Sequence, residues 1–171
     1  LLADLLREVP FHVAVHGNNH AMDFGESGLR FQQSALQRLG LASCGSGLSI
    51  DEASKPAYVR MGSLTVAIIS FSCVRPKTIG ATESKAGVFL IHDPADIAQK
   101  LKSIIWEAKI KAHLVIVSPH WNENWESTPR QSIRQQAHIL IEMGCDAILG
   151  HSSHLLQGIV VYQGNLILYD I

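Results

Sequence analysis

Leu114-Val115-Ile116-Val117-Ser118 is a nearly continuous β-branched run, which is typical of a strand buried on both faces of a sheet. Residues 129–143 then carry apolar side chains at helical spacing, and Gly144 follows as a stop signal. Ala147-Ile148-Leu149 comes next and has the composition of a second strand. Two strands joined by a crossover that contains a helix form a parallel pair. This stretch therefore predicts an α/β fold.

The rest of the chain alternates between helical and strand-like segments. Strands are expected at 11–15, 41–44, 58–60, 64–69, 158–162 and 166–169, with the last four forming two hairpins, and helices at 1–9, 26–39 and 93–111. Gly40 suits a helix end and Pro94 suits a helix start. Gly45-Ser46-Gly47 lacks the Lys and the full glycine spacing of a phosphate-binding loop, so it is expected to form a turn. We therefore expect mixed β-sheet layers flanked by helices, in a single domain over residues 1–171.

The composition narrows the function classes. The 171 residues include 14 Lys or Arg and 15 Asp or Glu, and a net charge of −1 argues against a protein that follows the phosphates of a nucleic acid. An apolar share of 47% excludes intrinsic disorder. The longest near-apolar run, residues 64–74, is shorter than the roughly 20 residues of a bilayer span, so no membrane span is expected. Cys44, Cys73 and Cys145 form no CxxC pair, and reduced buried thiols are the simplest interpretation.

Histidines follow the expected strands. His120 follows one strand of the parallel pair, His151 and His154 follow the other, and Asn19 lies in the loop after the first expected strand. Ligands of open α/β sheets bind outside the carboxyl ends of the strands, so we expect these four side chains at one edge of the sheet. Neutral imidazole suits Zn, Mn or Fe, and an amide oxygen binds harder divalent ions. Such a mixed set predicts a hydrolytic metal centre in which the ion activates water.

His20 and Asp23 form a second group in the loop that carries Asn19. They are three residues apart, so the carboxylate can hold the imidazole by a hydrogen bond. An imidazole positioned in this way beside a metal can protonate a leaving group. We therefore expect His20 to be the catalytic acid and Asp23 to orient it.

Several residues beside the expected metal ligands allow both a functional and a structural interpretation. Trp121, Glu123 and Trp125 either line a substrate pocket or belong to a pinned surface loop. His16 is either a loop residue or part of the site. Cys145 lies at a helix end before a strand, where no helix N-terminus activates a thiol, so a thiol nucleophile is not favoured. The remaining histidines are expected to be structural or surface residues: His12, His92, His113 and His138.

Four segments occur in an order that is similar to a known family. They are NNHAMDFG at 18–25, HWNE at 120–123 followed by Pro129, GHSSHLLQ at 150–157 and GNLILY at 164–169. These segments resemble the motifs of the bacterial capsule synthesis protein CapA family, and the likeness extends over nearly the whole chain. Two departures are Ser152 and Ser153, which stand where the family has His and Pro.

The resemblance implies a calcineurin-like metallophosphoesterase fold with αββα layers. It also implies His20 as the proton donor, Asp23 as its orienting partner, and four metal ligands: Asn19, His120, His151 and His154. The family's first metal motif and a following acidic ligand would precede Leu1, and the end of the domain would follow Ile171. The chain also opens without a signal peptide. We therefore expect a fragment of the full domain.

For function, the resemblance implies capsule (poly-γ-glutamate) biosynthesis in the extracytoplasmic cell envelope. The expected site is metal-dependent and hydrolase-like, with a Mn, Fe or Zn ion as the cofactor. Expected partners are an anionic polymer or a small phosphorylated substrate, together with other capsule synthesis proteins. One alternative is a non-catalytic polymer-binding or scaffold subunit of a synthesis or export complex. Another is a metallophosphoesterase for a nucleotide or phospholipid, which would differ only in the lining of its pocket.

Overall fold

The computed structural model describes residues 11–74, 79–91, 95–121 and 123–171. Three sequence expectations lie outside these residues: the helix at 1–9, the helix start at Asp93-Pro94, and the surface role of His92. Asn122 is also outside them.

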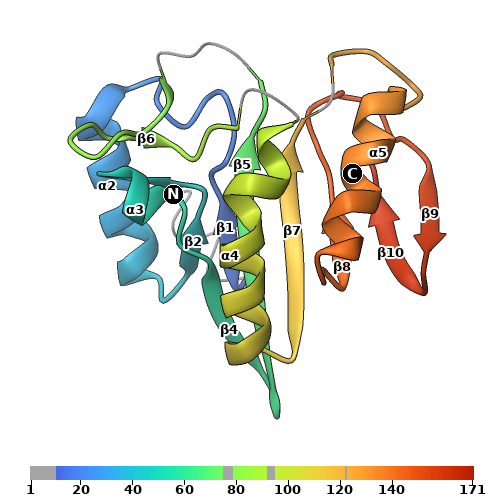
Figure 1. Ribbon diagram of the computed structural model, residues 1–171. Coiled ribbons are helices and arrows are strands. Elements are labelled where there is room, and N and C mark those ends of the chain that lie inside the picture. Colours follow the sequence, from blue (N-terminus) through green and yellow to red (C-terminus); the bar gives the residue numbers. More distant parts are fainter. Residues whose placement is uncertain (1–10, 75–78, 92–94, 122) are drawn as a thin grey trace.

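The predicted strands and helices of the described residues occur in the predicted order, and the structure adds three short elements that were not predicted, β3 (Ser46–Gly47), α3 (Ile50–Ala53) and β6 (Gly87–Val88) (Figure 1). The strands are β1 (Val13–Val15), β2 (Ala42–Cys44), β3 (Ser46–Gly47), β4 (Ala57–Met61), β5 (Leu64–Ser72), β6 (Gly87–Val88), β7 (Leu114–His120), β8 (Ala147–Leu149), β9 (Ile159–Tyr162) and β10 (Asn165–Leu168). The helices are α2 (Gly25–Arg38), α3 (Ile50–Ala53), α4 (Asp96–Lys111) and α5 (Gln131–Glu142).

A six-stranded mixed sheet with the order β4-β5-β7-β8-β10-β9 forms the centre of the molecule. Its four inner strands are parallel: β5 pairs with β7, β7 with β8, and β8 with β10. The two outer strands are antiparallel to their neighbours because each belongs to a hairpin. The parallel arrangement brings the carboxyl ends of β5, β7 and β8 to the same edge, as the α/β prediction requires.

Helices cover one face of this sheet, and a second small sheet covers part of the other. Alternate residues of the inner strands, such as Val117 and Ile148, pack with α4 and α5 in the main hydrophobic core. On the opposite face, Val66 and Ile68 of β5 pack against Cys44 and Val15 of the parallel β1-β2 pair. Helix α2 contacts β2 and buries Leu29 and Leu36. The order of layers is therefore helix, sheet, sheet, helix, which confirms the predicted fold class.

Backbone geometry explains where two helices end and corrects one local prediction. Gly40 and Gly144 have φ values of 71° and 108°, a left-handed conformation that glycine adopts without a steric penalty, and each stands just after a helix. The turn predicted at residues 45–47 is wrong in part, because Ser46–Gly47 pairs with Gly87–Val88 as a short antiparallel ladder. The tight approach of the Gly47 backbone to Glu52 and Ala53 leaves no room for a side chain there.

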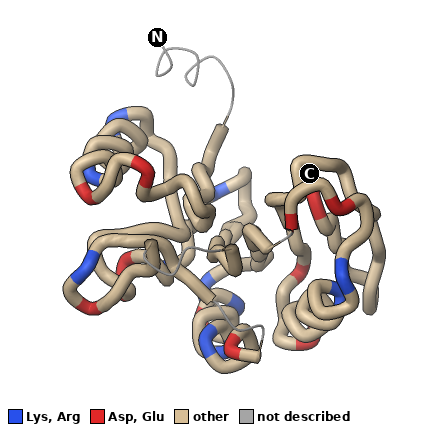
Figure 2. The backbone as a smooth tube through the Cα atoms, turned by 90° about the horizontal axis from the view of Figure 1, so that it is seen from above, with Lys and Arg blue, Asp and Glu red and all other residues tan. Residues whose placement is uncertain are grey.

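Charged residues of both signs alternate on the outer helices and loops rather than separating onto two faces (Figure 2). Among the described helices, none is both long and apolar enough to cross a lipid bilayer.

Candidate functional site

The loop after β1 lies against the carboxyl end of β5. The backbone N–H of Gly17 donates to Ser70 Oγ at 3.2 Å, and a Cβ on Gly17 would lie 2.5 Å from the backbone N of Phe71. Only a residue without a side chain allows this approach. Because β7 is the parallel neighbour of β5, the same contact places the loop with Asn19 and His20 at the edge where β7 ends in His120.

His120 and His151 form a buried imidazole pair at this edge. A parallel bridge joins the two residues, and their Nδ1 atoms lie 2.8 Å apart. Burial, together with charge repulsion from the nearby rings of His151, His20 and His154, lowers the pKa of His120 to about 3. Burial also lowers the pKa of His151, although the charge of Asp170 opposes this shift. Both rings are therefore neutral near pH 7, which is the form that binds metal ions.

His20 and Asp23 make the hydrogen bond that their spacing predicts. His20 Nδ1 lies 2.9 Å from Asp23 Oδ2, and both side chains are more than half exposed. Because an ionised carboxylate only accepts, Nδ1 carries the proton. His20 Nε2 lies 3.4 Å from Asn19 Nδ2, so the Asn19 amide donates to it and Asn19 Oδ1 stays available as an oxygen ligand.

The loop with His154 is held in an unusual backbone conformation. His154 and Trp125 have φ values of 61° and 66°, which residues other than glycine adopt at a cost. Their rings stack with a centroid distance of 5.5 Å, and the Trp125 N–H donates to Ser153 O at 2.7 Å. Asp170 Oδ2 accepts a 2.7 Å hydrogen bond from the N–H of Ser153. These contacts fix the direction in which the His154 ring points.

The four expected metal ligands are thus gathered to different degrees. His120 and His151 touch, His154 is close enough to act on the charge of His120, and Asn19 contacts His20. Within the part of the chain that the structure describes, no group of three or more His, Cys, Asp or Glu side chains is arranged to hold a metal ion. The buried Nε2 of His151 makes no hydrogen bond there, and a buried donor or acceptor without a partner is costly. Two neutral imidazoles with an unpartnered nitrogen fit part of a divalent metal site.

The structure places Trp121 in the interior and Glu123 at the surface. Its indole is only 4% exposed, belongs to the main hydrophobic core, and donates from Nε1 to Tyr169 O at 3.2 Å. Glu123 is exposed and ion-paired with Arg130 at 2.6 Å, while Arg130 also binds Glu126. The ion pair with Arg130 holds Glu123 at the surface, whereas Trp121 belongs to the core. A Trp directly after a buried strand continues the core as readily as it lines a cleft, and sequence alone does not separate these outcomes.

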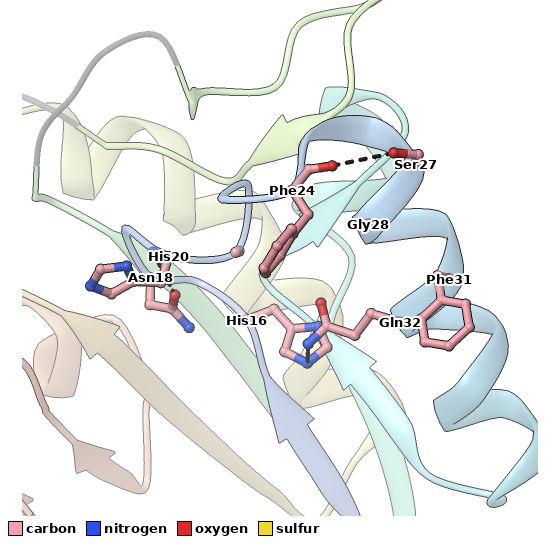
Figure 3. A pocket seen from close by; sticks show the side chains of 9 residues that line it. His16, Asn18, His20, Phe24, Ser27, Gly28, Phe31 and Gln32 are labelled. Carbon is pink, nitrogen blue, oxygen red and sulfur yellow. Dashed lines mark hydrogen bonds between the residues drawn. The ribbon is translucent and has the colours of Figure 1, made fainter. Parts of the chain in front are cut away.

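Three features of the site were not predicted. They are the direct contact of His120 with His151, the stacking of Trp125 on His154, and a pocket beside His20 that includes His16 and Gln32 (Figure 3). The pocket does have a sequence signal: Phe24, Gly28 and Phe31 recur at helical spacing, so they share one face of α2.

Comparison with known proteins agrees with the motif order. The family model described as bacterial capsule synthesis protein PGA_cap matches residues 2–171. The chain belongs to this family. It is 33% identical over 168 residues to the PGA biosynthesis protein CapA of Bacillus subtilis (strain 168), covering 98% of the chain and 43% of that protein. It is 35% identical over 164 residues to a probable polyglutamine synthesis accessory protein of Mycobacterium tuberculosis, covering 92% of the chain and 43% of that protein. This PGA_cap chain thus spans less than half the length of these relatives.

Solved structures support the fold of this PGA_cap chain. One is a putative 5'-nucleotidase from Staphylococcus aureus in complex with alpha-ketoglutarate, with a TM-score of 0.62, 17% identity, and coverage of 98% of this chain and 33% of that one. Another is a phosphatase from Mycoplasma pneumoniae, with a TM-score of 0.50, 13% identity, and coverage of 99% and 64%. At these identities the likeness concerns the fold, which is metallophosphoesterase-like.

Proposed function

We propose that this PGA_cap chain carries the hydrolase-like site of a capsule biosynthesis protein of the cell envelope, in a single domain. The site would act on an anionic polymer or on its phosphate- or amide-bearing precursor. The observation that carries the proposal is the exposed His20 imidazole, held by Asp23 at 2.9 Å on the loop that reaches the buried histidine pair. The names of the relatives refer to PGA and polyglutamine synthesis, which supports a glutamate-derived polymer as the substrate class.

In this proposal, His20 gives a proton to the leaving group and Asp23 holds it in position. The Asp23 carboxylate fixes the ring and balances the positive charge of a protonated imidazole. The proton that His20 gives up sits on Nε2, so the Asn19 amide must turn away from its 3.4 Å contact with Nε2 when the ring is protonated. The exposure of both His20 and Asp23 leaves room for a substrate to reach the ring from solvent.

Asn19, His120, His151 and His154 are the residues that would hold a divalent Mn, Fe or Zn ion. When bound, such an ion would polarise the scissile group and lower the pKa of a water molecule. The low pKa of His120 keeps this ring neutral and ready to bind a cation, and the unpartnered Nε2 of His151 offers a second nitrogen. Trp125 and Asp170 hold the loop that presents His154.

The test is turnover of a generic phosphoester by the full-length protein in the presence of Mn²⁺, together with capsule formation in cells. Replacing a general acid typically costs about 10²–10⁴-fold in rate, so His20→Ala should lose at least 100-fold, and Asp23→Asn should lose less. His12→Ala removes an exposed histidine from the same part of the chain and serves as the matched control. Full turnover and full capsule formation in His20→Ala would contradict the proposal.

A second candidate is a non-catalytic polymer-binding or scaffold subunit of a synthesis or export complex. The absence of a three-residue His, Cys, Asp or Glu metal group from the described part favours it, as does the word accessory in the name of one relative. This candidate predicts no bound metal in the purified full-length protein and normal capsule formation in His20→Ala cells. The hydrolase predicts the opposite in both measurements.

A further inference from the structure

A pocket of about 710 Å³ opens between the loop after β1 and the first turns of α2 (Figure 3). His20 lines this pocket and is also the proposed proton donor, so a group held there would lie beside the reacting bond. The pocket is therefore a candidate substrate subsite, and its lining indicates which part of the substrate it takes.

No Lys, Arg, Asp or Glu side chain is among the residues that line the pocket. His16 is 7% exposed, and burial lowers its pKa, so its ring is uncharged at neutral pH. His20 is the one lining group that the proposed mechanism protonates. A carboxylate or phosphate placed away from His20, against Phe24 and Phe31, would lose its hydration without meeting a cation. The part of the pocket beside the two phenyl rings thus favours an uncharged group.

Two phenyl rings form the apolar part of the pocket. Phe24, which directly precedes α2, and Phe31, which lies in α2, are 85% and 72% exposed, and both line the pocket. Gly28 stands between them, and a Cβ there would lie 2.5 Å from Cβ of Phe24. Glycine at this position therefore leaves space beside Phe24. Covering the two rings with methylene groups would remove apolar surface from water at about 25 cal/mol per Å².

One acceptor faces this apolar wall. Gln32 Nε2 lies 3.1 Å from His16 Nε2, and since an amide nitrogen only donates, the His16 nitrogen accepts. This contact fixes the Gln32 amide and leaves its Oε1 without a hydrogen bond from the described residues. Figure 3 shows this oxygen on the side of the pocket that faces Phe24. Gln32 is thus placed to accept a hydrogen bond from an N–H group of a ligand.

We propose that this pocket is a specificity subsite for an uncharged, amide-bearing segment of the substrate chain, and this rests on the proposed function. Gln32 Oε1 accepts from the amide N–H, and Phe24 and Phe31 pack on the methylene groups beside it. A γ-linked glutamyl chain has both groups in its backbone, while its carboxylates branch off and can stay in solvent. The pocket would therefore bind the amide and methylene groups of the polymer backbone rather than its carboxylates.

The test is equilibrium binding of a short γ-linked glutamate oligomer to the full-length protein by calorimetry. Gln32→Ala and Phe31→Ala should each weaken binding about tenfold, and Phe31→Leu should restore part of the affinity. Gln37→Ala is the matched control, because Gln37 is exposed on α2 outside the pocket. N-methylation of the amides removes the N–H groups that Gln32 would bind. The methylated oligomer should therefore bind wild type more weakly than the unmethylated oligomer does, whereas Gln32→Ala should bind the two oligomers equally well.

Failure of this subsite is distinguishable from failure of the proposed hydrolase. If the wild type binds the oligomer through Gln32 and Phe31 but turns over no phosphoester, the subsite stands and the hydrolase does not. If the wild type does not bind the oligomer, or if both variants bind it as wild type does, the subsite is refuted. Tighter binding of a free nucleoside than of the oligomer, lost in the same variants, would also refute it.

Discussion

Gly150→Ala should destabilise the fold at the point where β8 delivers His151. A Cβ on Gly150 would lie 2.6 Å from Trp121 Nε1 and would clash with the backbone oxygen of Tyr169. Real Cβ atoms do not approach other atoms so closely, so the added methyl group must push apart the indole and the end of β10. The added methyl group would therefore break the 3.2 Å hydrogen bond that Trp121 Nε1 donates to Tyr169 O.

The expected cost follows from these two effects. Overpacking a core by one methyl group costs about 1–3 kcal/mol, and losing a buried hydrogen bond costs about 1 kcal/mol more. The free energy of unfolding should therefore fall by roughly 2–4 kcal/mol, and the melting temperature by roughly 5–15 °C. A typical domain stability of about 5–15 kcal/mol means that the variant should still fold.

Urea denaturation of the full-length protein, followed by tryptophan fluorescence, measures this change. Gly158→Ala is the matched control, since Gly158 lies in the same connection and a Cβ there meets nothing within 4 Å. If Gly150→Ala and Gly158→Ala both unfold within about 0.5 kcal/mol of wild type, the close approach at Gly150 is not a constraint and the reasoning fails.

Three further predictions concern the thiols, the His154 loop and acid stability. Burial raises the pKa values of all three cysteines to about 12, so native protein should react with iodoacetamide at pH 8 far more slowly than unfolded protein, and fast native labelling would contradict this. Trp125→Ala should broaden the His154 ring signals in NMR spectra and weaken Mn²⁺ binding, because it removes the stacked ring. Trp125→Phe should retain most of the stacking, so equal effects of the two substitutions would refute the role of the ring. Burial lowers the pKa of His16 in the folded protein below its unfolded-state value of 6.5. As the pH is lowered through 6.5, the unfolded state therefore takes up a proton that the folded state does not, and the free energy of unfolding decreases. His16→Gln should flatten this loss between pH 7 and 5 in chemical denaturation, and an unchanged slope would count against it.

The local chemistry of the chain was enough to predict the α/β fold class, and the order of its motifs was enough to indicate the family. The β-branched run that became β7, the apolar spacing of α5 and the glycines at 40 and 144 act within one or two turns of the chain. Short-range sterics and hydrophobic periodicity therefore predict each element without knowledge of its neighbours. The prediction that His20 and Asp23 pair is of the same kind, because three residues on a tight loop bring the side chains together.

The packing around these elements was decided only by the tertiary structure. Whether Trp121 entered the core or a cleft depended on the space beside Tyr169, which follows β10 and is 48 residues away along the chain. The contact between His120 and His151, the stacking of Trp125 on His154, and the neutral state of the buried rings all depend on which side chains exclude water at that edge. Burial and desolvation are properties of three-dimensional neighbours, and the residue pattern along the chain does not contain them.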